Sequence, residues 1–326
     1  MSDLHGIILE ILQDGEFHTK KSFGAGLAIS SDQIDEVLHE LQASGLVLIS
    51  PEGLGYRLSD SVELLSRTAI FDYLSTVDPR PNCRLKILSA VDSTNRYARE
   101  QAANHASSGL VVLAEKQTAG RGRRGKVWVS PLASNIYMSV VWDFSGAGDT
   151  LKGLSLAIGV AVRRALLKLG VADIKLKWPN DIFVNGKKLG GILLEMIGDP
   201  SAECSFIVGI GINVLMPDSS AEAIDQDWTD LQKASSVTIS RNELVACLIT
   251  ETFEVLGNFQ RTGFSVYRAE WQAADLLKNQ SGTISKDRES VSGIVLGVDN
   301  SGSLRMRLSD GEEQRFIGGE LSLRKS

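Results

Sequence analysis

Hydrophobic side chains recur at helical spacing in two places within the first 45 residues, a pattern typical of two short amphipathic helices, and a second, short helix fits the segment between them. The first predicted helix ends at Asp14-Gly15, the second spans residues 20–28, and the third is expected to begin at an N-cap, Ser31, and to end at Gly45. The apolar positions of the first and third helices are Leu4, Ile7, Ile8, Ile11, Leu12, Ile34, Val37, Leu38 and Leu41.

Two short strands are predicted directly after these helices. An apolar run at residues 46–49 and the segment 56–58 flank a turn at residues 51–55 that contains proline and two glycines, and such a pattern is typical of a hairpin. Three helices followed by a two-stranded hairpin describe a winged helix-turn-helix, with its turn at residues 29–30. A small helical interaction domain explains the same pattern, and this alternative stays open.

The next part of the chain mixes strands with helices. A linker helix is predicted over residues 61–80 and a long helix over residues 151–169, and Asn185-Gly186 is a strong hairpin signal. The predicted strands are residues 84–91, 110–115, 135–142, 174–178, 181–184, 188–196 and 205–214. Strand pairs joined by hairpins, with helices between groups, favour an α+β layer over a doubly wound sheet.

The last fifty residues return to short alternating strands. Turns are expected at residues 299–302 and 310–311, and we predict a small β-barrel. The domain boundaries expected from these patterns are residues 1–62 for the winged helix-turn-helix, 63–82 for the linker helix, 83–272 for the central domain and 273–326 for the barrel.

Composition and cysteine content are those of an ordinary globular protein. Hydrophobic residues make up 43% and charged residues 23% of the 326 positions, which argues against a disordered chain. The three cysteines, Cys83, Cys204 and Cys247, form no CxxC pair, so we expect neither a disulfide framework nor a zinc site. The sequence has neither a signal peptide nor the run of about 18 apolar residues that a membrane span needs, and we expect a soluble cytoplasmic protein.

Negative charge is concentrated at the N-terminus. The formal net charge is −6, and the first 60 residues contain ten acidic and three basic side chains, so this segment carries −7 and the remainder +1. The acidic residues of the third predicted helix are Asp32, Asp35, Glu36 and Glu40. Carboxylates oppose contact with DNA phosphates, so this surface is a poor electrostatic match for DNA.

A basic, glycine-rich segment with the sequence GRGRRGK spans residues 120–126 and follows a predicted strand. Glycine lets backbone amides approach a ligand, and arginine offers forked donors to phosphate or carboxylate oxygens. The segment is neither a P-loop nor a dinucleotide-binding GxGxxG, since Pro131 and strand-like residues follow it. Its four cations repel one another, so we expect the loop to be mobile until an anionic ligand neutralises it. A solvated basic loop without a role is the alternative.

Three further polar motifs accompany this loop. KWPND at residues 177–181 is a binding cluster or a structural tight turn, and Lys188 on the following strand is expected to point toward the same site as Asp181. DSTN at residues 92–95 lies between a predicted strand and helix, where an N-cap is the simpler explanation. The glycines of GIGIN, residues 209–213, indicate that something packs closely against this strand.

The segments DSTN, AEKQTAGRGRRGKVW, KWPNDIFVNGKKLGGIL and GIGINV, in this order, are similar to motifs of bacterial biotin–protein ligases. The chain resembles the bifunctional ligase/repressor members of that family across nearly its full length, and the pairing of GRGRRG with KWPND is highly specific. This resemblance implies a winged helix-turn-helix, a central mixed-sheet α/β ligase domain of the biotin/lipoate ligase type and a C-terminal small SH3-like β-barrel. It also implies ATP-dependent activation of biotin to biotinyl-5'-AMP and transfer of the biotinyl group to a carrier-protein lysine.

The same resemblance implies roles for individual residues. The residues expected to bind biotin are Ser93, Thr94, Asn95, Gln117, Arg121, Gly122, Arg123 and Lys188. The residues expected to bind ATP or the adenylate are Arg124, Trp128, Asn180, Asn213 and Trp228. The expected catalytic residues are Lys188, Arg123 and Asp181, with Lys188 stabilising charge as pyrophosphate leaves and Asp181 orienting the carrier lysine. Magnesium (Mg²⁺) is expected to accompany ATP, held mainly by phosphates rather than by a protein cage.

Three partners follow from the resemblance: the biotin carboxyl carrier protein of acetyl-CoA carboxylase, operator DNA, and a second copy of the chain in a ligand-induced homodimer. The candidate DNA contacts are Lys20, Lys21, Ser31, Gln33, His39 and Arg57. Because the third helix is acidic, a ligase whose N-terminal domain is an interaction module stays open. A lipoate–protein ligase would lack the GRGRRG and KWPND pairing, and Lys188, Arg123 and Asp181 speak against a biotin sensor without catalysis.

Overall fold

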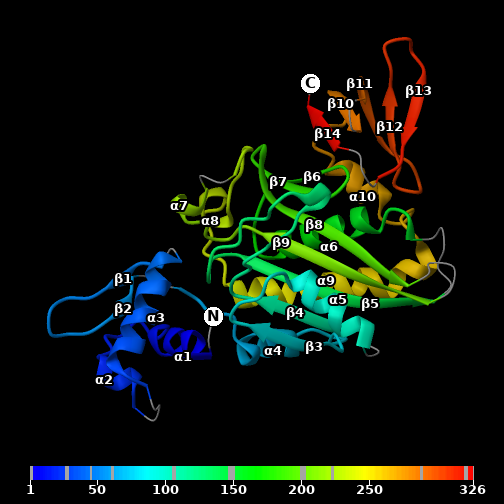
Figure 1. Cartoon of the computed structure of the whole chain (residues 1–326). Coiled ribbons are helices and arrows are strands. Elements are labelled where there is room, and N and C mark those ends of the chain that lie inside the picture. The colour runs from blue at the N-terminus through cyan, green and yellow to red at the C-terminus, as the bar shows by residue number, and fades with distance from the viewer. Residues whose placement is uncertain are drawn as a thin grey trace.

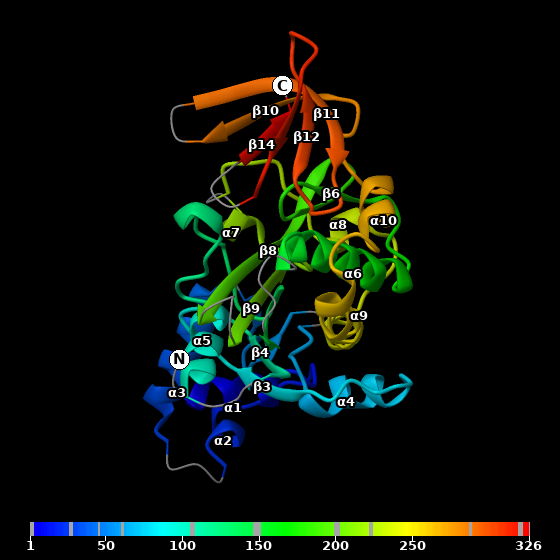
Figure 2. The same ribbon diagram turned by 90° about the vertical axis from the view of Figure 1, so that its right-hand side faces the viewer.

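The computed structural model describes residues 3–25, 29–44, 46–59, 62–104, 108–145, 151–198, 203–221, 224–286, 289–318 and 322–325. A helical N-terminal unit, a central sheet flanked by helices and a C-terminal sheet follow one another along the chain, with the first and last at opposite ends of the molecule (Figures 1 and 2). In the part of the chain so described, no helix is long and apolar enough to cross a membrane.

The N-terminal unit contains three helices and a two-stranded antiparallel hairpin, as the hydrophobic pattern predicts. Its elements are α1 (Asp3–Leu12), α2 (Lys20–Phe23), α3 (Ser31–Ala43), β1 (Leu48–Ile49) and β2 (Arg57–Leu58). The predicted length of α2 is wrong, because Gly24 follows Phe23 as its C-cap and glycine favours helix ends over helix interiors. Residues 26–28 of that predicted helix, and Gly45, lie outside the described residues.

The predicted N-cap of α3, Ser31, is wrong by one residue. The cap is Ser30, whose hydroxyl accepts the backbone N–H of Gln33 at 3.3 Å, while the Gln33 side chain accepts the N–H of Ser30 at 2.9 Å. This reciprocal pair is a capping box and satisfies two backbone donors at the start of the helix. Ser31 is followed three positions later by Ile34, which cannot form such a pair.

The N-terminal unit packs against the central domain. Its buried hydrophobic core includes Leu132 and Ala133, which belong to a loop of the central domain. The ammonium group of Lys116 donates to the hydroxyl of Ser44, the C-cap of α3, at 3.0 Å. The last turn of α3 is therefore fixed to a segment of the central domain that also carries Gln117.

A short extended segment and α4 (Arg67–Ser75) join the two parts. The predicted linker helix over residues 61–80 is too long, because the residues before α4 bind the central domain instead of forming helix. The backbone N–H of Leu65 donates to the carboxylate of Glu115 at 2.5 Å, and the same carboxylate pairs with Arg241 at 2.8 Å. Both charged side chains are buried, so each compensates the charge of the other.

A seven-stranded mixed sheet forms the central domain within the described residues. In spatial order its strands are β3 (Arg84–Leu88), β4 (Leu110–Ala114), β5 (Ile136–Ser145), β9 (Glu203–Ile212), β8 (Lys187–Gly198), β7 (Asp181–Val184) and β6 (Ile174–Lys177). The β3–β4 pair is parallel and the other pairs are antiparallel. Helices α6 (Leu154–Lys168) and α9 (Arg241–Thr262) pack with α4 on one face and form the main core. On the other face, α5 (Thr94–Asn104) buries Ala98 against Val112 and Val141.

The predicted strands and the long helix of this domain are confirmed, with strand ends that differ by up to three residues. The hairpin predicted at Asn185-Gly186 joins β7 to β8, and both residues have positive φ, at 51° and 73°. A two-residue turn of this kind favours Asn-Gly because it requires left-handed backbone at both positions. The remaining short helices are η1 (Arg123–Gly125), α7 (Asp218–Ala221), α8 (Leu231–Ala234) and α10 (Arg268–Ala273).

Five antiparallel strands form the C-terminal sheet. In spatial order they are β13 (Glu313–Phe316), β12 (Leu304–Arg307), β11 (Glu289–Val298), β10 (Ser281–Lys286) and β14 (Ser322–Lys325). The predicted turns at residues 299–302 and 310–311 are confirmed, since they connect β11 to β12 and β12 to β13. No pairing between β13 and β14 closes the sheet within the described residues, so the barrel stays a prediction. The indole N–H of Trp178 donates to the carbonyl of Gly302 at 3.1 Å and joins this sheet to the central domain.

Candidate functional site

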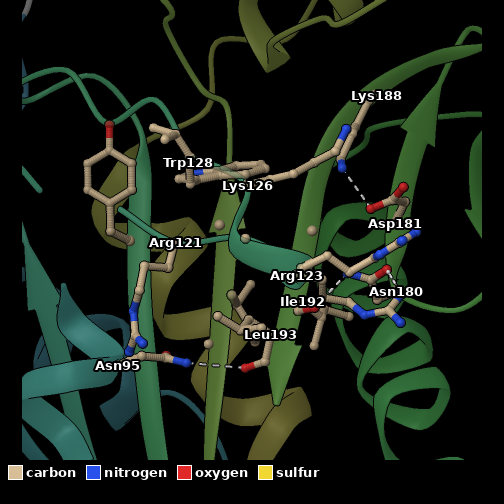
Figure 3. Close-up of a pocket in the computed structure, with 18 of the residues that line it drawn as sticks. Asn95, Arg121, Arg123, Lys126, Trp128, Asn180, Asp181, Lys188, Ile192 and Leu193 are labelled. Carbon is tan, nitrogen blue, oxygen red and sulfur yellow. Dashed lines mark hydrogen bonds and ion pairs between the residues drawn. The ribbon is translucent and has the colours of Figure 1, made fainter. Parts of the chain in front are cut away.

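A cavity of about 780 Å³ opens on the face of the central sheet that α5 partly covers. The GRGRRGK loop borders one side, and the ends of β7 and β8 border the other (Figure 3). The residues with predicted roles that line it are Ser93, Thr94, Asn95, Gln117, Arg121, Gly122, Arg123, Arg124, Trp128, Asn180, Asp181 and Lys188. The structure thus brings together all predicted biotin residues and three of the five predicted adenylate residues.

Glycines form the floor of this cavity. At Gly211 a Cβ atom would lie 2.7 Å from the indole ring of Trp128, and at Gly209 it would collide with the side-chain amide of Asn95. The prediction that something packs closely against this strand is confirmed, because two side chains of the site lie directly on its backbone. The glycines are therefore needed to seat Asn95 and Trp128.

One end of the cavity is a hydrogen-bonded polar cluster. The side-chain carbonyl of Gln117 accepts the backbone N–H of Thr94 at 2.9 Å and the Thr94 hydroxyl at 3.1 Å. The Gln117 amide donates to Ser130 at 3.0 Å, and the Ser139 hydroxyl lies 2.8 Å from that of Thr94 and donates to Asn95 at 2.6 Å. Such a network holds donors and acceptors in fixed directions toward a polar ligand.

The GRGRRGK loop is held as an irregular hairpin. Arg121 and Val127 form an isolated antiparallel bridge, and the N–H of Gly122 donates to the carbonyl of Lys126 at 2.7 Å. At its tip Arg124 has a φ of 58°, a left-handed conformation that non-glycine residues seldom adopt. The mobility of this loop before a ligand binds stays a hypothesis.

Arg123 reaches from the loop to the KWPND turn, where its guanidinium donates to the side-chain oxygen of Asn180 at 3.1 Å. Burial lowers the pKa of Arg123 below its ordinary value, although the nearby Asp181 carboxylate opposes this shift. The amide of Asn180 donates in turn to the carbonyl of Ile192 at 2.8 Å. A partly desolvated guanidinium in this position attracts an anion more strongly than an exposed one does.

Lys188 and Asp181 point toward one another from neighbouring strands (Figure 3), with Nζ of Lys188 2.7 Å from Oδ1 of Asp181. The predicted proximity of the two side chains is confirmed. The Lys188 ammonium also lies 5.8 Å from the centre of the Trp128 ring, a cation–π distance. The exposed fractions of the Lys188 and Asp181 side chains are 15% and 20%, so both remain accessible to a ligand.

A smaller cavity of about 210 Å³ adjoins the first and shares Trp128 and Lys188 with it. It contains Asn213 and Trp228, the two predicted adenylate residues absent from the larger cavity. Trp228 forms an isolated bridge to Lys188, and the ammonium of Lys233 lies 4.5 Å from its ring. The side-chain oxygen of Asn213 and the indole N–H of Trp128 are buried without a hydrogen-bond partner. An unpaired acceptor and an unpaired donor beside an indole ring suit a flat heterocycle that carries both kinds of group.

Glu195 also belongs to the site, although none of the sequence motifs predicts it. Its carboxylate accepts from Asn95 at 2.7 Å and pairs with Arg121 at 3.2 Å, so it links the polar cluster to the loop. The available signal was a single charged side chain in the otherwise uncharged strand residues 189–198. Ser139 and Ser130, which orient the polar cluster, carried no comparable signal.

The candidate DNA contacts belong to the N-terminal unit (Figure 1), and none of them lines either cavity. Lys20 pairs with Asp35 of α3 at 2.6 Å, and Gln33 is engaged in the capping box. Arg57 stacks on the ring of Phe17 at 5.2 Å. The remaining candidates, Lys21, Ser31 and His39, are exposed.

The central domain and the C-terminal sheet each match a known protein family. Residues 88–213 match the biotin/lipoate A/B protein ligase family, and residues 283–324 match the biotin protein ligase C terminal domain. The chain is 33% identical over 319 residues to the bifunctional ligase/repressor BirA of Escherichia coli, a match that covers 98% of this chain and 97% of that protein. It is 32% identical over 242 residues to the biotin–[acetyl-CoA-carboxylase] ligase of Paracoccus denitrificans, covering 72% of this chain and 100% of that one.

Solved structures give the same result. The biotin protein ligase from Aquifex aeolicus in complex with biotin and ATP has a TM-score of 0.64 and 28% sequence identity to this chain, and the match covers 74% of this chain and 99% of the other. The chain is similar to a bifunctional ligase/repressor over almost its whole length, and it contains both family domains in the same order. These two findings assign the chain to a family. The chain belongs to the biotin–protein ligases of the biotin/lipoate A/B protein ligase family.

Proposed function

We propose that this protein condenses biotin with ATP to form biotinyl-5'-AMP and then transfers the biotinyl group to a lysine of the biotin carboxyl carrier protein of acetyl-CoA carboxylase. The observation that carries this proposal is the continuity of the two cavities, which meet at Trp128 and Lys188. A polar cluster lies at one end, Trp228 and the unpaired oxygen of Asn213 lie at the other, and cationic side chains lie between them. That order matches biotinyl-5'-AMP, which has the ureido ring of biotin at one end, the adenine base at the other and the phosphate between them.

The polar cluster supplies the biotin site. Ser93, Thr94, Asn95 and Gln117 offer hydroxyl and amide groups to the ureido ring. The hydrogen bonds between Thr94 and Gln117, and the one from Ser139 to Asn95, fix the directions of these groups before the ligand binds. Arg121, Gly122 and Arg123 of the loop cover the bound biotin and exclude water from the mixed anhydride that forms later.

In the first step, an oxygen of the biotin carboxylate attacks the α-phosphorus of ATP. A carbon–oxygen–phosphorus link forms, the bond to the β-phosphate oxygen breaks, and pyrophosphate leaves. Lys188, on β8, and Arg123, on the GRGRRGK loop, both line the larger cavity on the side of Asn180 and Asp181 (Figure 3). Their positive charges stabilise the negative charge that grows on the phosphate in the transition state.

In the second step, the neutral amine of the carrier lysine attacks the biotinyl carbonyl. A carbon–nitrogen bond forms, the carbon–oxygen bond to AMP breaks, and the amine loses a proton. Asp181 lies beside Lys188 at the edge of the cavity, where its carboxylate orients the incoming amine and helps to remove that proton.

The adenine base occupies the smaller cavity. Trp228 and Trp128 contact its faces, the oxygen of Asn213 accepts from its amino group, and Arg124 and Asn180 bind the ribose and phosphate side. Mg²⁺ accompanies ATP and supplies charge neutralisation through the phosphates. Among the described residues, no group of three or more His, Cys, Asp and Glu side chains is suited to hold a metal ion, and we assign the ion no protein ligand.

The N-terminal unit is a winged helix-turn-helix that represses biotin-synthesis genes by binding operator DNA as a ligand-induced homodimer. Three helices and a hairpin in this order, together with the match to a bifunctional ligase/repressor over 98% of the chain, support this role. The acidic α3 motivates the alternative, in which the unit is an interaction module of a ligase that does not bind DNA. Domain limits at residues 1–62, 63–82, 83–272 and 273–326, an SH3-like closure of the last domain and a cytoplasmic location belong to the same proposal.

Labelling of a purified carrier domain tests the catalytic proposal. With biotin and MgATP, the protein should attach one biotin to the acceptor lysine, and a carrier in which that lysine is replaced by arginine should stay unlabelled. Lipoate offered in place of biotin should not be attached. Efficient transfer of lipoate, or no transfer of biotin by folded protein, would contradict the proposal.

A further inference from the structure

Glu195 occupies the place where two parts of the site meet. Glu195 lies on β8, four residues after Gly191, and its partner on β9 is Ile207, four residues before Gly211. Because side chains an even number of residues apart on a strand face the same side, the Glu195 side chain lies on the cavity face of the sheet, as Gly211 does. Its carboxylate accepts from Asn95 at 2.7 Å and from Arg121 at 3.2 Å. One carboxylate oxygen, Oε2, takes part in both contacts.

The contact with Asn95 determines how that amide is oriented. The oxygen of Asn95 accepts from Ser139 at 2.6 Å, and its nitrogen donates to Glu195 and, more weakly, to the carbonyl of Leu193 at 3.4 Å. A side-chain amide has its donor and acceptor on opposite sides, so a hydroxyl donor at one side and a carboxylate acceptor at the other fix one orientation.

The contact with Arg121 holds the base of the GRGRRGK loop. The side chain of Glu195 is 18% exposed and that of Arg121 is 44% exposed. Since Arg121 also forms the backbone bridge to Val127, restraining its side chain restrains the hairpin that carries Arg123. A partly exposed ion pair contributes modestly to stability. When the free-energy difference between a closed and an open loop is small, however, a contact of this size changes how often the loop opens.

We propose that Glu195 is a positioning residue of the ligase site, which orients Asn95 toward biotin and tethers the loop over the adenylate through Arg121. This inference rests on the proposed function of Asn95 and of the loop. Glu195 touches neither substrate in this role, and its effects on the reaction are transmitted by the two residues that it binds.

The two contacts predict different consequences for two substitutions. In Glu195→Gln the side-chain oxygen still accepts from Asn95, but the charge that attracts Arg121 is gone. In Glu195→Ala both contacts are lost. Loop closure should therefore weaken in both variants, whereas biotin binding should weaken mainly in Glu195→Ala.

Two quantities are measured for each full-length variant. They are the KM for biotin and the rate at which preformed biotinyl-5'-AMP is released into solution. Glu195→Gln should release the adenylate about threefold faster, the effect expected of a partly exposed ion pair, with a nearly unchanged KM. Glu195→Ala should show the same release and a KM for biotin raised about tenfold, the loss expected for a charge-assisted hydrogen bond. Glu313→Gln, which removes an ion pair with Arg305 on the C-terminal sheet, is the matched control and should change neither quantity.

Arg121→Gln separates failure of this inference from failure of the proposed function. If Arg121→Gln releases the adenylate faster but Glu195→Gln does not, Glu195 does not tether the loop and the inference is wrong. If neither variant alters release, the proposed role of the loop itself fails. Equal effects of Glu195→Gln and Glu195→Ala on KM would overturn the assignment of separate contacts.

Discussion

The ammonium of Lys188 lies 2.7 Å from the carboxylate of Asp181, and the two side chains come from strands joined by the Asn185-Gly186 turn. This short hairpin fixes the two charged side chains on neighbouring strands, where both line the larger cavity and Lys188 also lines the smaller one. Because Lys188 is paired before substrates bind, its charge is held at the site without a large reorganisation of the side chain.

Arg123→Gly should loosen closure of the loop over the activated biotin. The substitution removes the hydrogen bond from Arg123 to Asn180 that joins the loop to the KWPND turn, and loss of a contact of this kind changes an equilibrium by about tenfold. Activated biotin should therefore escape and label lysines of unrelated proteins. Streptavidin blots of a protein mixture measure this labelling, and a pattern equal to that of the unsubstituted protein would contradict the account of the loop.

Gly211→Ala should displace Trp128 from the floor of the cavity. A Cβ at this position would lie 2.7 Å from the indole ring, whereas a Cβ at Gly191, its partner across the strand pair, would lie at an ordinary 3.7 Å from the same ring. Overpacking of this kind costs about 1–3 kcal/mol, so affinity for ATP should fall by about tenfold or more. Isothermal titration with Gly191→Ala as the matched comparison tests this, and equal losses in the two variants would count against it.

Asp275 should make stability depend on pH. Burial raises its pKa to about 6 from an ordinary 3.8, and its Oδ2 atom is buried without a hydrogen-bond partner. Because the folded protein binds this proton more tightly than the unfolded chain, the group favours folding at low pH, and this stability is lost as pH rises from about 4 to 6. At pH 7 the charged carboxylate then costs about 3 kcal/mol.

Asp275→Asn should remove most of that penalty. The free energy of unfolding, measured by urea denaturation, should rise by about 1–3 kcal/mol at pH 7.5 and change little at pH 4. A gain of equal size at both pH values would show that the effect does not come from ionisation of this carboxyl.

Operator binding should depend on ligands and on the acidic α3. Fluorescence anisotropy of DNA from upstream of the host's biotin-synthesis genes should rise with protein concentration when biotin and MgATP are present, and should weaken steeply with salt. Asp35→Asn should strengthen binding about threefold, because it removes a like charge and frees Lys20 from its ion pair. Protein that still biotinylates its carrier but fails to bind this DNA at low salt would support the ligase-only alternative.

Much of the fold was predictable because its signals are local. Alternating apolar residues, the Asn185-Gly186 turn and the two C-terminal turns predict the strand pairs that the structure contains. The errors concern ends: the cap of α3 is Ser30 because of the side chain three residues later, and the linker helix is short because Leu65 binds Glu115. Hydrophobic periodicity does not show which of two neighbouring serines caps a helix, nor does it show a contact between residues fifty positions apart.

The site was predictable where its residues form dense motifs and unpredictable where single residues connect them. Lys188 and Asp181 were brought together by one hairpin, so their proximity followed from the turn between them. Glu195 lies about a hundred residues from Asn95 in the chain, and the carbonyl of Gly302, which binds the Trp178 indole, belongs to another sheet. Only the packing of the folded chain reveals such pairs.

The most direct test of the central claim is the burst of pyrophosphate released when the protein is mixed with biotin and ATP in the absence of carrier. The unsubstituted protein should release about one pyrophosphate per active site and then stop, because the adenylate stays bound until an amine arrives. Lys188→Ala should slow this burst by about a hundredfold or more, the cost of removing one charge that stabilises the transition state, while folded protein still binds biotin. A burst of normal rate in Lys188→Ala would contradict the assignment of this cavity as the site of adenylate formation.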